Sequence, residues 1–127
     1  MDINTHQKID RNLCGTPLEV SEGFSRIELL LTENMTADES DLIHGGFVFG
    51  LADYAAMIAV NHPNVVLGSS DVKFLKPLKK GDSVLAEARV ENIAGKKHTV
   101  RVTVENKKTK VFEGIFTCFV LEKHVLS

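Results

Sequence analysis

The sequence predicts an α+β domain in which an antiparallel sheet of five or six strands curves around one long central helix. The stretch from His44 to Asn61 is almost wholly apolar, which is typical of a buried helix. Short segments before and after it alternate apolar and polar residues and are separated by tight turns, as antiparallel strands are. The 127 residues, of which 43% are hydrophobic, suffice for a single core, so we expect one domain over residues 1–127.

A short amphipathic helix is predicted first, over about residues 5–13. Ile9 and Leu13 lie one helical turn apart, Thr5 is placed to cap the helix, and Cys14 and Gly15 end it. We expect this lead-in helix to serve packing.

A hairpin follows between Leu18 and Leu31, with its turn at Glu22 and Gly23. Its second strand alternates, so that one face carries Ser25, Ile27, Leu29 and Leu31. The polar segment 32–41 has no periodicity and is predicted to be a loop that leads into the central helix.

The central helix is predicted over about residues 45–61, and its one ionised side chain is Asp53. Aspartate is a mediocre helix former, and burial of its charge without partners costs on the order of several kcal/mol. The residue therefore needs either a function or a buried hydrogen-bond partner. Gly50, one turn earlier, is interpreted as a place where the helix approaches a strand rather than as a ligand contact.

Four strands are predicted after the helix, at about residues 65–76, 83–93, 98–105 and 111–121, with turns between them. The last of these is apolar on both faces, so we expect it to be central in the sheet. One helix covers little of the apolar surface of such a sheet. A second copy of the chain is the simplest partner to cover the remaining apolar surface.

Composition narrows the classes of function. The net charge of −2 and the absence of a basic face give no indication of a nucleic-acid partner. The polar N-terminus lacks a signal core, and the central helix falls short of a membrane span, so we expect a cytoplasmic protein. Cys14 and Cys118 lack metal-ligand or redox-motif spacing and are predicted to be free, buried thiols, and no metal site is expected.

Two motifs carry a resemblance to a known family. HGGFVFGLAD at residues 44–53 and VKFLKPLKKGD at residues 72–82 resemble hotdog-fold acyl-CoA thioesterases of the phenylacetate-degradation (PaaI-like) type. The resemblance implies a homodimer, or a tetramer made of two such dimers, with each active site across the dimer interface. The acyl chain would run beside the helix, and coenzyme A, part of the substrate rather than a cofactor, would lie toward the surface.

The resemblance also implies roles for residues at the helix. Asp53 matches the acid that activates water or attacks the thioester carbonyl, and the Gly45 N–H matches the donor to the oxyanion. Gly46 lets substrate approach the backbone, while His44 at the helix entrance is expected to border the substrate and fix the turn. Asp38 stands where many relatives have an asparagine that polarises the carbonyl, and an ionised aspartate has no hydrogen to donate.

Further binding residues are implied on the strand after the helix. Either Ser69 or Ser70 would supply a polar group near Asp53. One or two lysines, among them Lys73 and Lys76, would meet the phosphates of coenzyme A, unless they only form a solvated edge that prevents sheet-to-sheet aggregation.

Three classes of function follow. The first is an acyl-CoA thioesterase, and the second is a protein that binds acyl-CoA without hydrolysing it and reports on its level. VKFLKPLKKGD also resembles hotdog-fold transcriptional regulators of fatty-acid synthesis, but those carry a DNA-binding part, for which we expect no room here, and typically lack the aspartate. The third class, hotdog dehydratases and hydratases, depends on histidine motifs that this sequence lacks.

Overall fold

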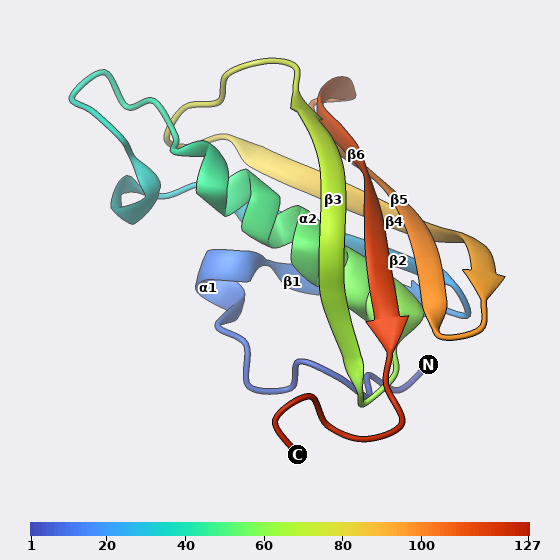
Figure 1. The fold of residues 1–127 in the computed structure, drawn as a ribbon. Helices are drawn as coiled ribbons and strands as arrows, with labels where there is room; N and C mark the ends of the chain where they lie inside the picture. The colour runs from blue at the N-terminus through green and yellow to red at the C-terminus, as the bar shows by residue number, and fades with distance from the viewer.

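The computed structural model describes all 127 residues and contains six strands and two α-helices. In chain order the elements are α1 (Arg11–Cys14), β1 (Thr16–Ser21), β2 (Phe24–Leu30), a 3-10 turn η1 (Glu33–Met35), α2 (Gly45–Val60), β3 (Val65–Phe74), β4 (Ser83–Ala94), β5 (Lys97–Asn106) and β6 (Thr109–Val120). All strand pairs are antiparallel, in the order β1-β2-β4-β5-β6-β3. The sheet curves around α2, as the sequence predicts (Figure 1).

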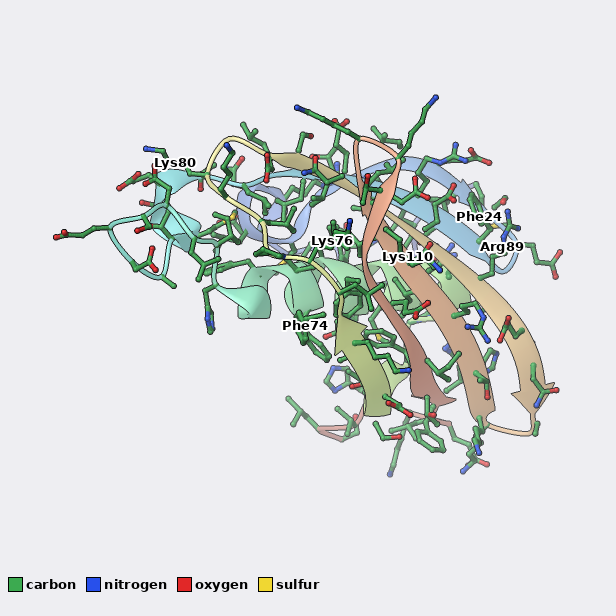
Figure 2. All side chains as sticks on the ribbon, turned by 90° about the horizontal axis from the view of Figure 1, so that it is seen from above. Phe24, Phe74, Lys76, Lys80, Arg89 and Lys110 are labelled. Carbon is green, nitrogen blue, oxygen red and sulfur yellow. The ribbon has the colours of Figure 1, made fainter.

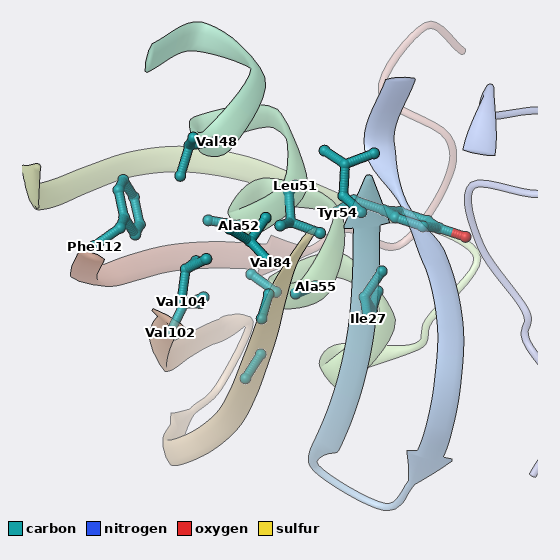
Figure 3. Packing of buried hydrophobic residues seen from close by; sticks show 14 of the residues in the cluster. Ile27, Val48, Leu51, Ala52, Tyr54, Ala55, Val84, Val102, Val104 and Phe112 are labelled. Carbon is teal, nitrogen blue, oxygen red and sulfur yellow. The ribbon is translucent and has the colours of Figure 1, made fainter. Parts of the chain in front are cut away.

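The core lies between α2 and the concave face of the sheet. Leu51, Ala52 and Ala55 of the helix are fully buried against strand residues such as Ile27 and Val102 (Figure 3). Alanines at this contact let the sheet come close to the helix backbone, because their side chains are short. The Ser25 hydroxyl of β2 accordingly donates a hydrogen bond to the Ala55 carbonyl at 2.7 Å.

The lead-in helix is shorter than predicted, since α1 comprises only Arg11–Cys14. Its cap is Asp10 rather than Thr5, whose hydroxyl instead contacts the His6 ring at 2.8 Å. Within the predicted range the chain departs from a helix at His6, whose φ is 52°, and the backbone just before this range is bound by a residue after α2. Asn61, in the left-handed conformation after α2, accepts from the Asn4 N–H at 2.7 Å and donates to the Asp2 carbonyl at 2.7 Å.

The strands follow the predicted pattern closely. Ile27 and Leu29 of β2 and Val100, Val102 and Val104 of β5 point inward and are buried, as their alternation predicts. β6 is paired on both sides, with β5 and β3, so its predicted central place is confirmed. Both cysteines are free, Cys118 fully buried and Cys14 half-buried. None of the helices has both the length and the apolar character that a membrane crossing requires.

Candidate active site

The entrance to α2 is fixed by the backbone around it. The Ile43 N–H donates to the Leu78 carbonyl and the His44 N–H to the Met35 carbonyl, both at 2.9 Å. His44 then caps the helix with extended backbone and no side-chain hydrogen bond. The N–H groups of Gly45 and Gly46 have no acceptor within the chain. Free donors and the positive end of the helix dipole therefore meet at this point.

The His44 ring explains the glycine at position 46. A Cβ there would lie 2.9 Å from Nε2 of His44, whose ring also meets Phe47 edge-on at 6.1 Å between centroids. The exposed histidine therefore folds back over the first turn of the helix. Neither His44 nor Gly46, both predicted to border the substrate, lines the pocket beside Gly45.

A pocket of about 290 Å³ opens beside Gly45. Phe74, at the end of β3, forms one wall, and a Cβ on Gly45 would lie 3.1 Å from its ring (Figure 2). The one charged residue of the lining is Lys76. The whole lining consists of Ile43, Gly45, Val48, Phe74, Leu75, Lys76, Pro77, Leu78 and Val111. The pocket thus combines apolar walls with an unused backbone donor and a cation at its rim.

Asp53 lies two turns further along α2 and has no hydrogen-bond partner in the chain. Its Oδ1 atom is buried and unpaired, and burial raises the pKa of the carboxyl group from 3.8 to about 6. A buried unpaired polar atom costs on the order of 1–3 kcal/mol. A buried structural acid bonded to a backbone group of its own chain is therefore not what the structure shows. A functional acid and an acid bonded to the partner subunit remain as the explanations for Asp53.

Asp53 and the Gly45 N–H do not meet within one chain. They are eight residues apart on the same helix, which corresponds to about 12 Å along its axis. A thioester carbonyl group is much shorter than this distance, so it cannot reach both residues. One chain alone therefore does not bring the two predicted catalytic groups to one carbonyl.

The alternation of β3 separates the residues predicted on it. Ser70 pairs with Phe116, whose buried side chain marks the face toward α2. Ser69 and Lys73 pair with Thr117 and Glu113 and point to the outer face. The structure therefore places Ser70 on the helix side, and it leaves Ser69 and Lys73 on the side of the sheet away from Asp53.

Other charged side chains of that outer face interact with one another. Lys73 shares a shallow hollow with Arg101 and Glu113, and the Arg89 guanidinium lies 4.4 Å over the Phe24 ring (Figure 2). These contacts belong to the solvent side of the sheet. Among the predicted lysines it is Lys76 that borders the pocket beside the helix.

Asp38 lies at the exposed tip of the loop before α2, which projects from the body of the molecule (Figure 1). Its Oδ1 accepts hydrogen bonds from the N–H groups of Ser40, at 2.9 Å, and Leu42, at 3.2 Å. The side chain therefore stabilises its own loop. It does not line the pocket beside Gly45.

Two features of the site were not predicted from the sequence. One is the contact of Phe74 with Gly45, because it depends on how the end of β3 meets the helix entrance, which no local pattern reveals. The interpretation of Gly50 is wrong, because no atom lies within 4 Å of a Cβ built there, so no strand approaches it.

Comparison with known proteins agrees with this fold. Residues 41–113 match the family model described as the thioesterase superfamily. The chain belongs to this superfamily. The uncharacterised protein PH1136 from Pyrococcus horikoshii is 49% identical in sequence to this chain. The alignment with its crystal structure covers 100% of this chain and 98% of PH1136, with a TM-score of 0.99.

The predicted resemblance to PaaI-like proteins is also confirmed. A mutant of the phenylacetic acid degradation protein PaaI from Thermus thermophilus is 28% identical over 86% of this chain and 95% of its own, with a TM-score of 0.80. The protein smu.793 from Streptococcus mutans, solved bound to acetyl CoA, is 24% identical over 93% of this chain and 97% of its own, with a TM-score of 0.82, and shows the same fold.

Curated relatives are longer and have diverse names. A methylthioribose-1-phosphate isomerase of Aquifex aeolicus is 50% identical over 96% of this chain but only 27% of its own length. Transcription factor FapR of Caldanaerobacter subterraneus is 30% identical over 75% of this chain, and a putative esterase of Archaeoglobus fulgidus is 31% identical over 74%. The chain spans 48% and 62% of those two proteins.

Proposed function

We propose that the protein is an acyl-CoA thioesterase whose active site is shared by two copies of the chain. The observation that carries the proposal is Asp53, a half-buried carboxylate whose Oδ1 atom is buried without a partner, in a chain of the thioesterase superfamily. A group that costs stability and has no partner within the chain is typical of a functional site. The acetyl CoA bound to smu.793 shows that this fold accommodates a thioester of coenzyme A.

Asp53 would act as the base. With a pKa of about 6, most of its carboxylate is ionised at neutral pH and still accepts a proton readily. It would take a proton from water as the oxygen attacks the thioester carbonyl carbon. When the C–S bond breaks, the proton would pass to the leaving thiolate of coenzyme A. Direct attack by the carboxylate would use the same position.

The Gly45 N–H would stabilise the oxyanion. It is a free donor at the positive end of α2, and Gly45 lines a pocket with apolar walls, where a hydrogen bond to a developing charge is strong. Since about 12 Å of helix separates it from Asp53 of the same chain, the donor would come from the partner subunit. The proposal therefore includes a homodimer, or a tetramer made of two such dimers.

A second candidate is a protein that binds acyl-CoA without hydrolysing it. Two observations favour it. The carboxylate of Asp38 has no hydrogen to offer a carbonyl and is occupied within its own loop. One relative of the chain is the transcription factor FapR. In this case Lys76 and the free N–H groups at the helix start would hold the ligand, and Asp53 would not act on it.

Thiol release from acyl-CoAs of graded chain length tests the proposal. Asp53→Asn should abolish turnover and keep acyl-CoA binding, which calorimetry measures. If the wild-type protein binds acyl-CoA but releases no thiol from any member of the series, the thioesterase proposal fails and the binding protein remains.

A matched pair of variants tests the donor. Gly45 is the first helical residue, where proline is well tolerated, and the extended backbone of His44 suits a following proline. Gly45→Pro removes the N–H, whereas Gly45→Ala keeps it and adds a Cβ toward Phe74. Turnover by the proline variant should be about 100-fold lower than by the alanine variant. Equal turnover would rule out the Gly45 N–H as oxyanion donor.

A further inference from the structure

Gly50 has no structural reason to be glycine within the chain. Its backbone is helical, with no positive φ, and no atom of another element lies within 4 Å of a Cβ built on it. The neighbouring Leu51 and Ala52, by contrast, are completely buried. An alanine at position 50 would therefore fit without strain.

Glycine at this position nevertheless weakens the helix. In a helix interior, glycine loses more backbone freedom on folding than alanine and stabilises the helix less. No close packing and no left-handed turn compensates for this loss at Gly50. The absence of a side chain is thus useful only to something outside the chain.

The position of Asp53 indicates what occupies the space above Gly50. Residues three apart share one face of a helix, and helical side chains lean toward the turn before their own Cα, so Asp53 leans toward the turn that contains Gly50. No side-chain atom of Asp53 comes within 4 Å of the Cβ position on Gly50. Asp53, with its unpaired Oδ1, and the open space above Gly50 therefore lie one turn apart on the same face of α2.

We propose that Gly50 determines which acyl groups the site accepts, because the acyl carbons next to the thioester carbonyl lie in the space above it. The inference rests on the proposed function, since it uses Asp53 as the group that meets the carbonyl. Bulk at position 50 would then exclude long or aromatic acyl groups and leave room for acetyl. The other candidate occupant of the space is the helix of a second subunit.

The variants Gly50→Ala and Gly50→Leu test this inference when their hydrolysis of acetyl-CoA, hexanoyl-CoA and phenylacetyl-CoA is compared with that of the wild-type protein. For Gly50→Leu we expect kcat/KM to fall by roughly 10-fold or more with the two larger substrates and by less than about 3-fold with acetyl-CoA. Gly50→Ala should raise the melting temperature by roughly 2–4 °C, because it removes the helix penalty. The control is Val60→Ala at the other end of α2, which should leave the ratio between substrates unchanged.

The outcomes separate this inference from the proposed function. An equal loss with all three substrates, or dissociation of the oligomer by Gly50→Leu in size-exclusion chromatography, overturns the role of Gly50. If the wild-type protein hydrolyses nothing, binding replaces turnover as the measurement. Gly50→Leu should then weaken hexanoyl-CoA binding roughly 10-fold and leave free coenzyme A binding unchanged. An equal effect on both ligands overturns the inference in that case too.

Discussion

Replacement of Asp53 by asparagine should stabilise the protein, by an amount that grows as the pH rises from about 4 to about 6 and then levels off. Burial raises the pKa of Asp53 from 3.8 to about 6, so the folded chain holds this proton more tightly than the unfolded chain does. The corresponding stabilisation is complete below the unfolded pKa and is lost as the pH rises through about 6. At 1.36 kcal/mol per pH unit, the loss is about 3 kcal/mol.

Asparagine keeps the size of the side chain but does not ionise, so it escapes this loss. The free energy of unfolding of Asp53→Asn should exceed that of the wild-type protein by about 3 kcal/mol at pH 8 and by only about 0.5 kcal/mol at pH 4. Taking the difference between variant and wild type cancels the titration of the other carboxylates.

Urea unfolding at pH 4, 5, 6, 7 and 8, at one fixed protein concentration, measures the difference. Glu28→Gln is the matched control, because Glu28 is an exposed carboxylate on β2 with no ion pair. Its difference from the wild-type protein should stay within about 0.5 kcal/mol at every pH.

A constant difference between Asp53→Asn and the wild-type protein from pH 4 to pH 8 would refute the reasoning. It would mean that the carboxylate of Asp53 is not desolvated and unpaired in solution. A difference of opposite sign at pH 8 would have a more specific meaning. It would show that a donor from outside the chain already stabilises the ionised Asp53, so that its cost is compensated before any substrate binds.

Three further substitutions test the packing around α2 by thermal or urea unfolding. Gly15→Ala should cost roughly 2–4 kcal/mol, because its φ is 110° and the new Cβ would lie 2.7 Å from Ile27. Ser25→Ala should cost about 1 kcal/mol through the lost hydrogen bond to Ala55. Asn61→Ala should cost about 1–2 kcal/mol and speed proteolysis before α1, because it frees the N-terminal segment.

Most of the fold could be predicted from the sequence because strand and helix periods are local properties. The alternation in β2, β4 and β5 identified their buried faces correctly, and the apolar run after Gly45 located α2. The lead-in helix was predictable only in part. His6 takes a positive φ of 52° inside the predicted range, and Asn61, more than fifty residues away, binds the backbone at Asp2 and Asn4 just before it.

The candidate site was predictable only in part. The motif at residues 44–53 located Gly45 and Asp53, and their spacing of eight residues in a predicted helix already implied that about 12 Å separates them in one chain. The choice between Ser69 and Ser70 needed the register of β3 against β6, including its irregularity between Leu67 and Ser69. Such an irregularity shifts every later side chain to the other face, and no sequence period reports it.

Gly50 and Asp53 together show where α2 departs from a stable helix. Its buried positions carry mostly leucine, alanine and methionine, which are good helix formers, and no side-chain polar atom of these residues is buried without a partner. Both departures lie one turn apart on the half-exposed face. The stability gained at pH 8 by Gly50→Ala and Asp53→Asn therefore measures what the helix gives up for this site, whatever the acyl group is.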